Sequence, residues 1–137
     1  MTERICPDCR GTGYIISSSG EKIQKTKEEM LNFYYAKVIS YFTEAIRIDP
    51  NDANAYYNRG NAYYDKREYD RAISDFNQVL KIDPNDAKAY YNRGAAYCQK
   101  EDYNKAWDDI CKAQKLGYQI NPEFLEALRR VSGKEIK

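Results

Sequence analysis

The sequence predicts an all-α protein in which antiparallel helix pairs stack against one another, and three observations support this fold class. The 16 residues at positions 49–64 recur at positions 83–98, which is 34 residues later, and 13 of them are identical. Apolar residues recur every three or four positions within each unit, as in an amphipathic α-helix. Aspartates and prolines stand where such helices would begin and end. A fixed period of this length is typical of helical repeat architectures.

Two units, residues 53–86 and 87–118, follow this pattern throughout. The first helix of the middle unit is expected at about 53–66 and the second at about 69–82. The apolar and aromatic positions of that second helix are Tyr69, Ala72, Ile73, Phe76, Val79 and Leu80. A final amphipathic stretch at 121–131 would cover the end of the stack, and residues 119–137 are assigned to this capping helix and the tail.

Start and stop signals agree with these boundaries. Asp52 and Asp86 stand where an N-cap side chain would accept hydrogen bonds from the free amides of the next helix. Pro84 follows the expected end of a helix, which a proline cannot continue. Gly60 and Gly94 would each cost about 1 kcal/mol inside a helix, so their shared phase indicates a close approach of the partner helix.

These residues resemble the tetratricopeptide repeat family, whose pattern places aromatic, small and proline residues at set points in 34 positions. The middle unit matches at Tyr56, Gly60, Tyr63, Ala72, Phe76 and Pro84. The last unit matches at Tyr90, Gly94, Tyr97 and Ala106, with Ile110 in place of the aromatic residue and no proline. The resemblance implies a right-handed superhelical stack of about three helix pairs plus a capping helix.

The first unit, residues 20–52, departs from the pattern because its leading half lacks the aromatic and small residues. Residues 21–48 contain neither glycine nor proline, and their apolar positions continue without a break. They could form a helical pair or one uninterrupted helix, and we expect the pair. A single helix would leave an open end of the stack that favours self-association, so a homodimer through the N-terminal region is a further expectation.

The resemblance implies that the first helix of each unit lines a concave groove that binds a peptide or a partner protein. The positions that correspond to the groove are Asn54, Tyr57, Asn58, Asn61, Tyr64 and Asp65, then Lys88, Tyr91, Asn92, Ala95, Cys98 and Gln99. Some members of the family hold a C-terminal carboxylate with lysine, arginine and asparagine. Only Asn58 and Lys88 match that set, whereas Asn92 stands where an arginine would, so Asn58 and Asn92 could equally bridge repeats or lie in solvent.

Charged residues inside the units are interpreted as structural or solvated. Arg59 and Arg93 would lay their aliphatic stems along apolar surface and keep their charges in water. Asp108 and Asp109 are adjacent on a helix and would diverge, which indicates a solvated face rather than a catalytic pair. The chain has no histidine, and no phosphate-binding GxxxxGK motif occurs. An enzyme is therefore not expected, and no catalytic residue is assigned.

A short N-terminal appendage, residues 1–19, carries Cys6 and Cys9 in a CxxCxGxG motif. This motif resembles half of the zinc module of DnaJ-type chaperones, which implies an alternative function as a zinc-binding, chaperone-associated factor. A structural zinc needs four ligands, so one ion would be shared between two chains. The other readings are a metal-free end or a redox pair. Residues 14–24 are expected to form a small hairpin, and Cys98 and Cys111 are expected to be half-buried and unrelated to a metal.

Charge and hydropathy exclude two further classes of partner. The chain has 22 basic and 21 acidic residues, so its net charge of +1 gives no reason to expect nucleic acid. No apolar run is long enough to span a bilayer, and no apolar signal segment opens the chain. The sequence therefore predicts a cytoplasmic interaction scaffold without a required cofactor.

Overall fold

The computed structural model describes residues 4–7, 13–16, 19 and 22–134. The chain divides into two compact units, Met1–Val38 and Ile39–Lys137. The division lies inside one helix, α1 (Lys27–Ile48), and the units are described in turn.

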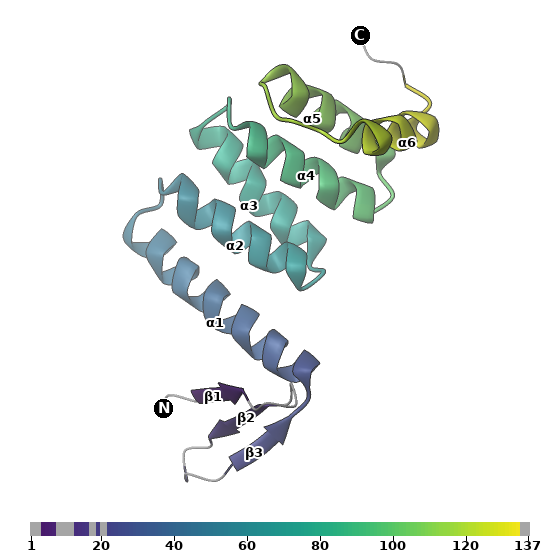
Figure 1. Cartoon of the computed structure of the whole chain (residues 1–137). Helices are drawn as coiled ribbons and strands as arrows, with labels where there is room; N and C mark the ends of the chain where they lie inside the picture. Colours follow the sequence, from purple (N-terminus) through teal and green to yellow (C-terminus); the bar gives the residue numbers. More distant parts are fainter. Residues whose placement is uncertain (1–3, 8–12, 17–18, 20–21, 135–137) are drawn as a thin grey trace. The chain divides into compact units, whose positions relative to one another are not determined.

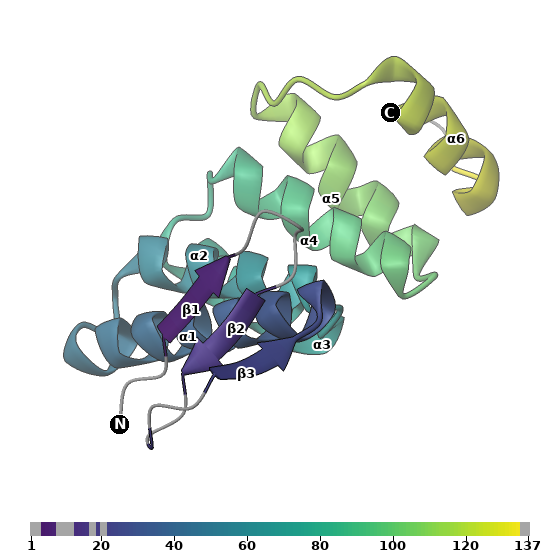
Figure 2. The same ribbon diagram turned by 60° about the horizontal axis from the view of Figure 1, so that its bottom comes forward.

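The first unit contains a three-stranded antiparallel sheet in the order β1-β2-β3 (Figure 2). Its strands are β1 (Arg4–Pro7), β2 (Gly13–Ile16) and β3 (Lys22–Lys25). The expected hairpin is present, since Tyr14 pairs with Gln24 across β2 and β3. The sheet extends past the expected end of the appendage at residue 19, so β3 occupies the beginning of the segment that we assigned to the first repeat.

A single helix, α1, follows the sheet, and the expected helical pair within residues 21–48 is wrong. Thr26 and Glu29 form a capping box: Glu29 N donates to Thr26 Oγ1 (3.3 Å), and Thr26 N donates to Glu29 Oε2 (2.8 Å). Because no glycine or proline follows, nothing interrupts the backbone ladder before Ile48. The first repeat therefore contributes one helix instead of two.

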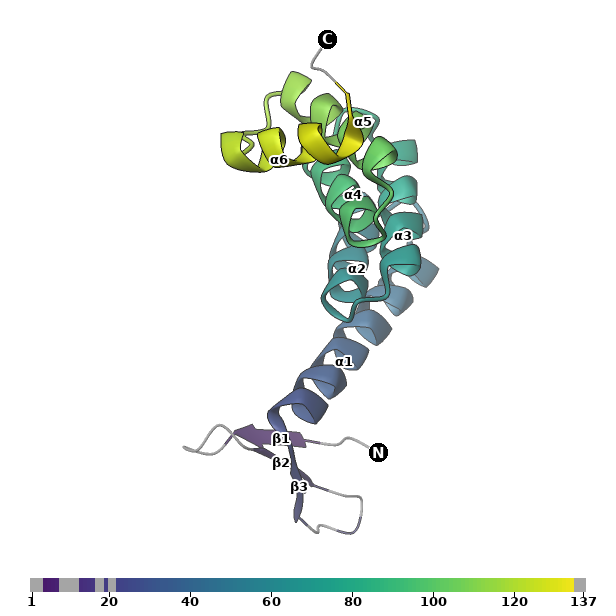
Figure 3. The ribbon, with the colours of Figure 1, turned by 90° about the vertical axis from the view of Figure 1, so that its right-hand side faces the viewer.

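The second unit contains the expected helix pairs, which lie side by side in Figure 1. They are α2 (Ala53–Asp65) with α3 (Tyr69–Ile82), and α4 (Ala87–Gln99) with α5 (Tyr103–Lys115), followed by α6 (Pro122–Ser132). Figure 3 shows α2 and α4 next to each other, with α3 on one side of them. The expected fold class is confirmed for the helical region.

The expected caps are in place at both first helices. Asp52 Oδ1 accepts from Ala55 N at 3.1 Å, and Asp86 Oδ1 accepts from Ala89 N at 3.0 Å. At α6, Asn121 Oδ1 accepts from Glu123 N at 2.8 Å, and Pro122 occupies the first turn, where its missing amide hydrogen costs nothing.

Close helix packing explains the two helical glycines. A Cβ added at Gly60 would lie 2.9 Å from Phe76 Cε1 and 3.2 Å from Asp75 Cβ. A Cβ added at Gly94 would lie 3.0 Å from Ile110 Cδ1. The partner helix thus rests directly against each glycine. Ala72 and Ala106, the small residues of the partner helices, are fully buried.

Each complete pair is also joined by a buried ion pair, which corrects two expectations. Arg59 Nε and Nη2 donate to the two oxygens of Asp75 at 2.8 and 2.7 Å. Arg93 binds Asp109 in the same way at 2.7 and 2.6 Å. The arginine charges are therefore not kept in water, and Asp109 is not on a solvated face, because burial of the aspartate requires a charged partner.

The same arginines also reach the preceding helix. Arg59 Nη1 donates to Thr43 Oγ1 at 3.1 Å, and Arg93 Nη1 donates to Asn77 Oδ1 at 2.8 Å. Thr43 and Asn77 are 34 positions apart, so the second half of α1 occupies the place of a second repeat helix.

Candidate functional site

A pocket of about 380 Å³ lies between α2 and α4, the first helices of the two complete pairs. Two tyrosines, two asparagines, an aspartate and an alanine line it: Asn61, Tyr64, Asp65, Tyr91, Asn92 and Ala95. The structure therefore brings together six of the twelve residues that the resemblance assigned to the groove. Tyrosine supplies contact area with a polar tip, and asparagine can both donate and accept hydrogen bonds.

Asn92 joins the two sides of this pocket. Its Nδ2 donates to Asn61 Oδ1 at 2.8 Å and to Tyr57 Oη at 3.0 Å. This is the bridging role that the sequence left open for Asn92. Among the residues that the structure describes, none donates to Asn92 Oδ1 or accepts from Asn61 Nδ2, so one acceptor and one donor remain at the pocket for a bound backbone.

Tyr91 is held by aromatic neighbours on the C-terminal side. Its ring stacks on Tyr118, with the centroids 4.6 Å apart and the planes at 27°. Phe124 of α6 meets the same ring edge-on at 6.4 Å. Tyr118 was missed at the level of the sequence, although an aromatic residue directly after the last repeat helix was a usable signal. The equivalent Tyr57 lies instead 6.0 Å from the Phe76 ring.

The electrostatic character of the pocket is set by one carboxylate and one phenol. Desolvation raises the pKa of Asp65 above its ordinary value. Burial raises the pKa of Tyr64, and a hydrogen bond with Gln99 opposes that shift. Tyr64 also meets Tyr69 edge-on at 5.4 Å. Among the described residues, no lysine or arginine lines the pocket, so these residues offer no cation to an anionic ligand.

Six of the twelve predicted groove residues lie outside the lining of this pocket: Asn54, Tyr57, Asn58, Lys88, Cys98 and Gln99. Asn54 and Asn58 are exposed on α2, where Asn58 Nδ2 donates to the Asn54 carbonyl at 2.8 Å. Lys88 is exposed in the first turn of α4. The two residues that match a carboxylate-holding set, Asn58 and Lys88, are therefore not brought into the lining.

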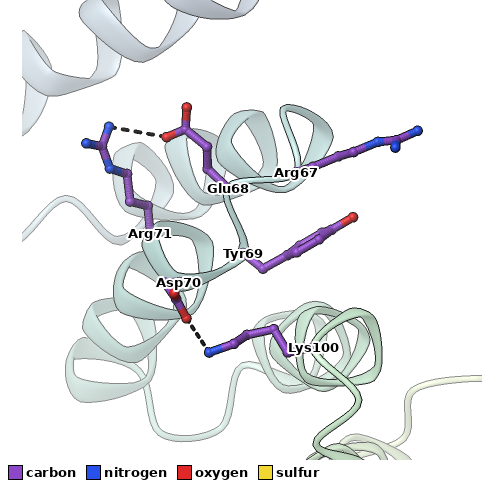
Figure 4. A pocket seen from close by; sticks show the side chains of 6 residues that line it. All are labelled: Arg67, Glu68, Tyr69, Asp70, Arg71 and Lys100. Atoms are coloured by element: carbon purple, nitrogen blue, oxygen red, sulfur yellow. Dashed lines mark hydrogen bonds and ion pairs between the residues drawn. The ribbon is translucent and has the colours of Figure 1, made fainter.

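A second pocket, of about 320 Å³, lies at the turn between α2 and α3 (Figure 4). Its lining is charged: Arg67, Glu68, Tyr69, Asp70, Arg71 and Lys100. The charges are already partnered in two places, because Arg71 pairs with Glu68 at 3.2 Å and Lys100 pairs with Asp70. Exposed pairs of this kind contribute little stability, about 0–1 kcal/mol each.

The structure describes three of the four cysteines, namely Cys6, Cys98 and Cys111. Cys98 and Cys111 are free, half-buried thiols, as expected, and burial raises the pKa of each. Cys6 lies in β1 and Gly13 begins β2, but Cys9 and Gly11 fall outside the described residues. Within the part of the chain that the structure describes, no cluster of ligands could hold a metal ion. Zinc binding stays a prediction, which metal analysis of the purified protein would check.

Comparison with known proteins identifies the class. Residues 42–66 and 60–101 match the family model described as TPR repeat. Together with the helix pairs and their 34-residue phase, this match supports tetratricopeptide repeats over residues 42–101. No curated protein matches the chain. No described helix is long and apolar enough to cross a membrane.

Solved structures share the fold at low sequence identity. The TPR domain of Arabidopsis OM64 is 28% identical, with a TM-score of 0.67, over 72% of this chain and 84% of that one. The first TPR domain of Spaghetti (RPAP3), bound to the HSP90 peptide SRMEEVD, is 28% identical, with a TM-score of 0.65, over 77% and 86%. YrrB, described as a TPR protein with an unusual peptide-binding site, is 33% identical, with a TM-score of 0.60, over 65% and 47%. The likeness supports a protein-interaction scaffold.

Proposed function

We propose that the chain is an interaction scaffold that binds an extended segment of a partner protein in the pocket between α2 and α4. The observation that carries this proposal is the joint lining of that pocket by Tyr64, Tyr91, Asn61 and Asn92. Two aromatic rings provide apolar contact, and the amides offer one donor and one acceptor to a peptide backbone. The peptides bound by similar TPR domains support a ligand of this class.

The charge of the lining favours a neutral or basic segment over an acidic one. Asp65 is the one charged residue among the described residues of the lining, and its carboxylate would repel an acidic ligand. Asn92 stands where the resemblance would place an arginine, and it uses its amide hydrogens to bridge α2 and α4. An acidic tail such as SRMEEVD, which the RPAP3 domain holds, would therefore find fewer cationic partners in this pocket.

Peptide binding measured by isothermal calorimetry tests this proposal. A panel of immobilised peptides first selects a ligand, and matched versions with lysine or glutamate at one position then measure its charge preference. We expect the lysine version to bind at least about tenfold more tightly, a difference of about 1.4 kcal/mol. Asp65→Asn should reduce that preference, since Asp65 is exposed and its replacement leaves the fold intact.

A second pair of variants locates the ligand. Asn61→Ala removes one pocket amide and should weaken binding, whereas Asn104→Ala, an exposed asparagine on α5, should leave it unchanged. Tyr64→Ala should weaken binding further, because an aromatic contact is lost. Equal affinities for all of these variants would place the ligand elsewhere and reject the pocket between α2 and α4.

A further inference from the structure

Among the residues that the structure describes, no helix covers the face of α1 that corresponds to the intra-repeat contact of α3. In α3, the residues that pack on α2 are almost fully buried, with Asp75 3% exposed and Phe76 0% exposed. Their equivalents 34 positions earlier are Tyr41 and Phe42. Tyr41 is 71% exposed, and no residue of α1 is buried. The missing first helix of the first repeat therefore leaves an uncovered apolar face.

This face carries a regular apolar pattern, which we call the α1 seam. Its residues are spaced alternately by three and four positions: Leu31, Tyr34, Val38, Tyr41, Ala45 and Ile48. Spacing of this kind places them in one stripe and is typical of a helix that pairs with another helix. Leu31, Tyr34 and Ile48 are 47%, 56% and 73% exposed. The contact from Thr43 to Arg59 of α2 lies on the opposite side of α1. Four of the six seam residues are exposed, and Val38 and Ala45 are half-buried.

We propose that the α1 seam pairs with the α1 seam of a second copy of this chain, in antiparallel orientation. The spacing of the seam residues is the same when read from either end of the helix, so two antiparallel copies can align all of them in pairs. When the pairing is centred between Ile39 and Ser40, Val38 lies opposite Tyr41 of the second copy. The same register sets Tyr34 opposite Ala45, and Leu31 opposite Ile48. Each layer then joins a larger residue to a smaller or aliphatic one, as a packed helix interface requires.

Charge complementarity selects this occupant and this orientation. Lys37 and Glu44 each stand one position before a seam residue, so both lie on the same flank of the stripe. Antiparallel pairing brings Lys37 of each copy next to Glu44 of the other, which forms the interaction twice. In a parallel, in-register pair, Lys37 would instead face Phe42, and Glu44 would face Asp49, a like charge just after the helix end. Glu44 is exposed, and among the described residues its partner is Arg47 of the same helix, whose Nη2 donates to it at 2.5 Å.

The length of the seam suffices for a helix pair in this protein. The α2–α3 pair uses helices of 13 and 14 residues, whereas the seam runs from Leu31 to Ile48. The pairing would thus provide, from a second copy, the helix that the first repeat lacks. It leaves the pocket between α2 and α4 untouched, so peptide binding and pairing can be measured separately.

Sedimentation of the full chain over a concentration series tests the pairing. We expect the wild type to form a concentration-dependent dimer. Tyr41→Asp should raise the dimer Kd by at least about tenfold, because an unpaired carboxylate would enter the interface from each copy. The fold should survive, since Tyr41 is exposed and an aspartate occupies the equivalent position of α3. Circular dichroism checks that the helical content is unchanged.

Ser40→Asp is the matched control, with the same new charge one residue away. Ser40 is exposed beside the seam, and its equivalent in α5 is the exposed Asp108, so the dimer Kd should change less than about threefold. A wild type that stays monomeric up to its solubility limit would overturn the proposal and assign the seam to another kind of partner. Equal effects of Tyr41→Asp and Ser40→Asp would overturn it as well.

A charge-reversal cycle tests the orientation. Lys37→Glu and Glu44→Lys should each weaken the dimer, because each places like charges side by side twice. The double variant should restore the Kd to within about threefold of the wild type, as a direct pair interaction predicts. Weakening by both single variants without restoration in the double variant would reject the antiparallel register.

Discussion

The α2–α3 pair and the α4–α5 pair are joined by the same arginine–aspartate contact, but their groove tyrosines have different neighbours. In both, an arginine of the first helix grips a buried aspartate of the second and reaches back to the preceding helix. In the last pair, however, the Tyr91 ring stacks on Tyr118 and meets Phe124 edge-on, whereas the Tyr57 ring lies against Phe76 of its own repeat. The repeat sequence thus determines the ion pair inside each helix pair, whereas the segment that follows determines which aromatic rings contact each groove tyrosine.

The largest expected effect comes from breaking the shared ion pair. Asp75→Ala and Asp109→Ala would each leave an arginine that is about one-fifth exposed without its partner. We expect each to lower the free energy of unfolding by about 3 kcal/mol, the lower end for a broken buried pair. Chemical denaturation measures the loss. Asp108→Ala, on the exposed side of α5, should cost less than about 1 kcal/mol. If the losses for Asp75→Ala and Asp109→Ala differed by more than the loss for Asp108→Ala, the two ion pairs would not be equivalent.

The glycines should distinguish the two pairs. Gly60→Ala would push a methyl group to 2.9 Å from the rigid ring of Phe76, whereas Gly94→Ala would meet the more adaptable side chain of Ile110 at 3.0 Å. Overpacking costs about 1–3 kcal/mol, and the better helix propensity of alanine returns about 1 kcal/mol. We therefore expect a net loss of about 1–2 kcal/mol for Gly60→Ala and less for Gly94→Ala in urea denaturation. The reverse order would contradict the packing argument.

Removal of Tyr118 should act mainly on one groove tyrosine. Tyr118→Ala deletes the stacking partner of Tyr91, and such a ring pair contributes about 0.5–1.5 kcal/mol. Nuclear magnetic resonance of the tyrosine rings should show a larger change of environment for Tyr91 than for Tyr57, which interacts with Tyr118 only electrostatically. Equal shifts at both groove tyrosines would indicate that the two repeats are coupled.

The smallest expected effect is a pH dependence of the stability of α6. This capping helix follows the last helix pair and has no counterpart after the middle pair. Hydrogen bonds from Arg129 and Arg130 lower the pKa of Glu126 from 4.5 to about 2. Because the folded pKa is depressed, this stabilisation is present above pH 4.5 and is lost as the pH falls toward 2. A carboxyl-carbon titration should give the low pKa, and Glu126→Gln should remove that part of the acid dependence of α6. A titration midpoint near 4.5 would contradict the contact.

The sequence predicted the complete repeats well because their signals are local and recur. The caps at Asp52 and Asp86, the phase of the glycines and the helix bounds could all be read from 34-residue spacing. The ion pairs were missed although Arg59, Arg93, Asp75 and Asp109 share that spacing, because surface charges usually lie in solvent and only packing shows which aspartate faces inward.

The first repeat could not be predicted in the same way. Residues 21–48 have apolar positions that suit either one helix or two, and the capping box at Thr26 and Glu29 decides only where the helix begins. The strand at Lys22–Lys25 depends on pairing with β2, which no local signal encodes. For the groove, the resemblance supplied the right helices, while the lining of the pocket depends on side-chain contacts such as that between Asn92 and Asn61.

The reach of Arg93 to Asp109 on one side and to Asn77 on the other has a consequence for protein engineering. Each 34-residue unit carries its own connector to the unit before it, and the preceding second helix supplies the acceptor. A copy of residues 53–86 inserted after residue 86 would bring both halves of that connection. The stack should therefore accept extra units in tandem, with each insertion lengthening the tyrosine- and asparagine-lined surface by one repeat.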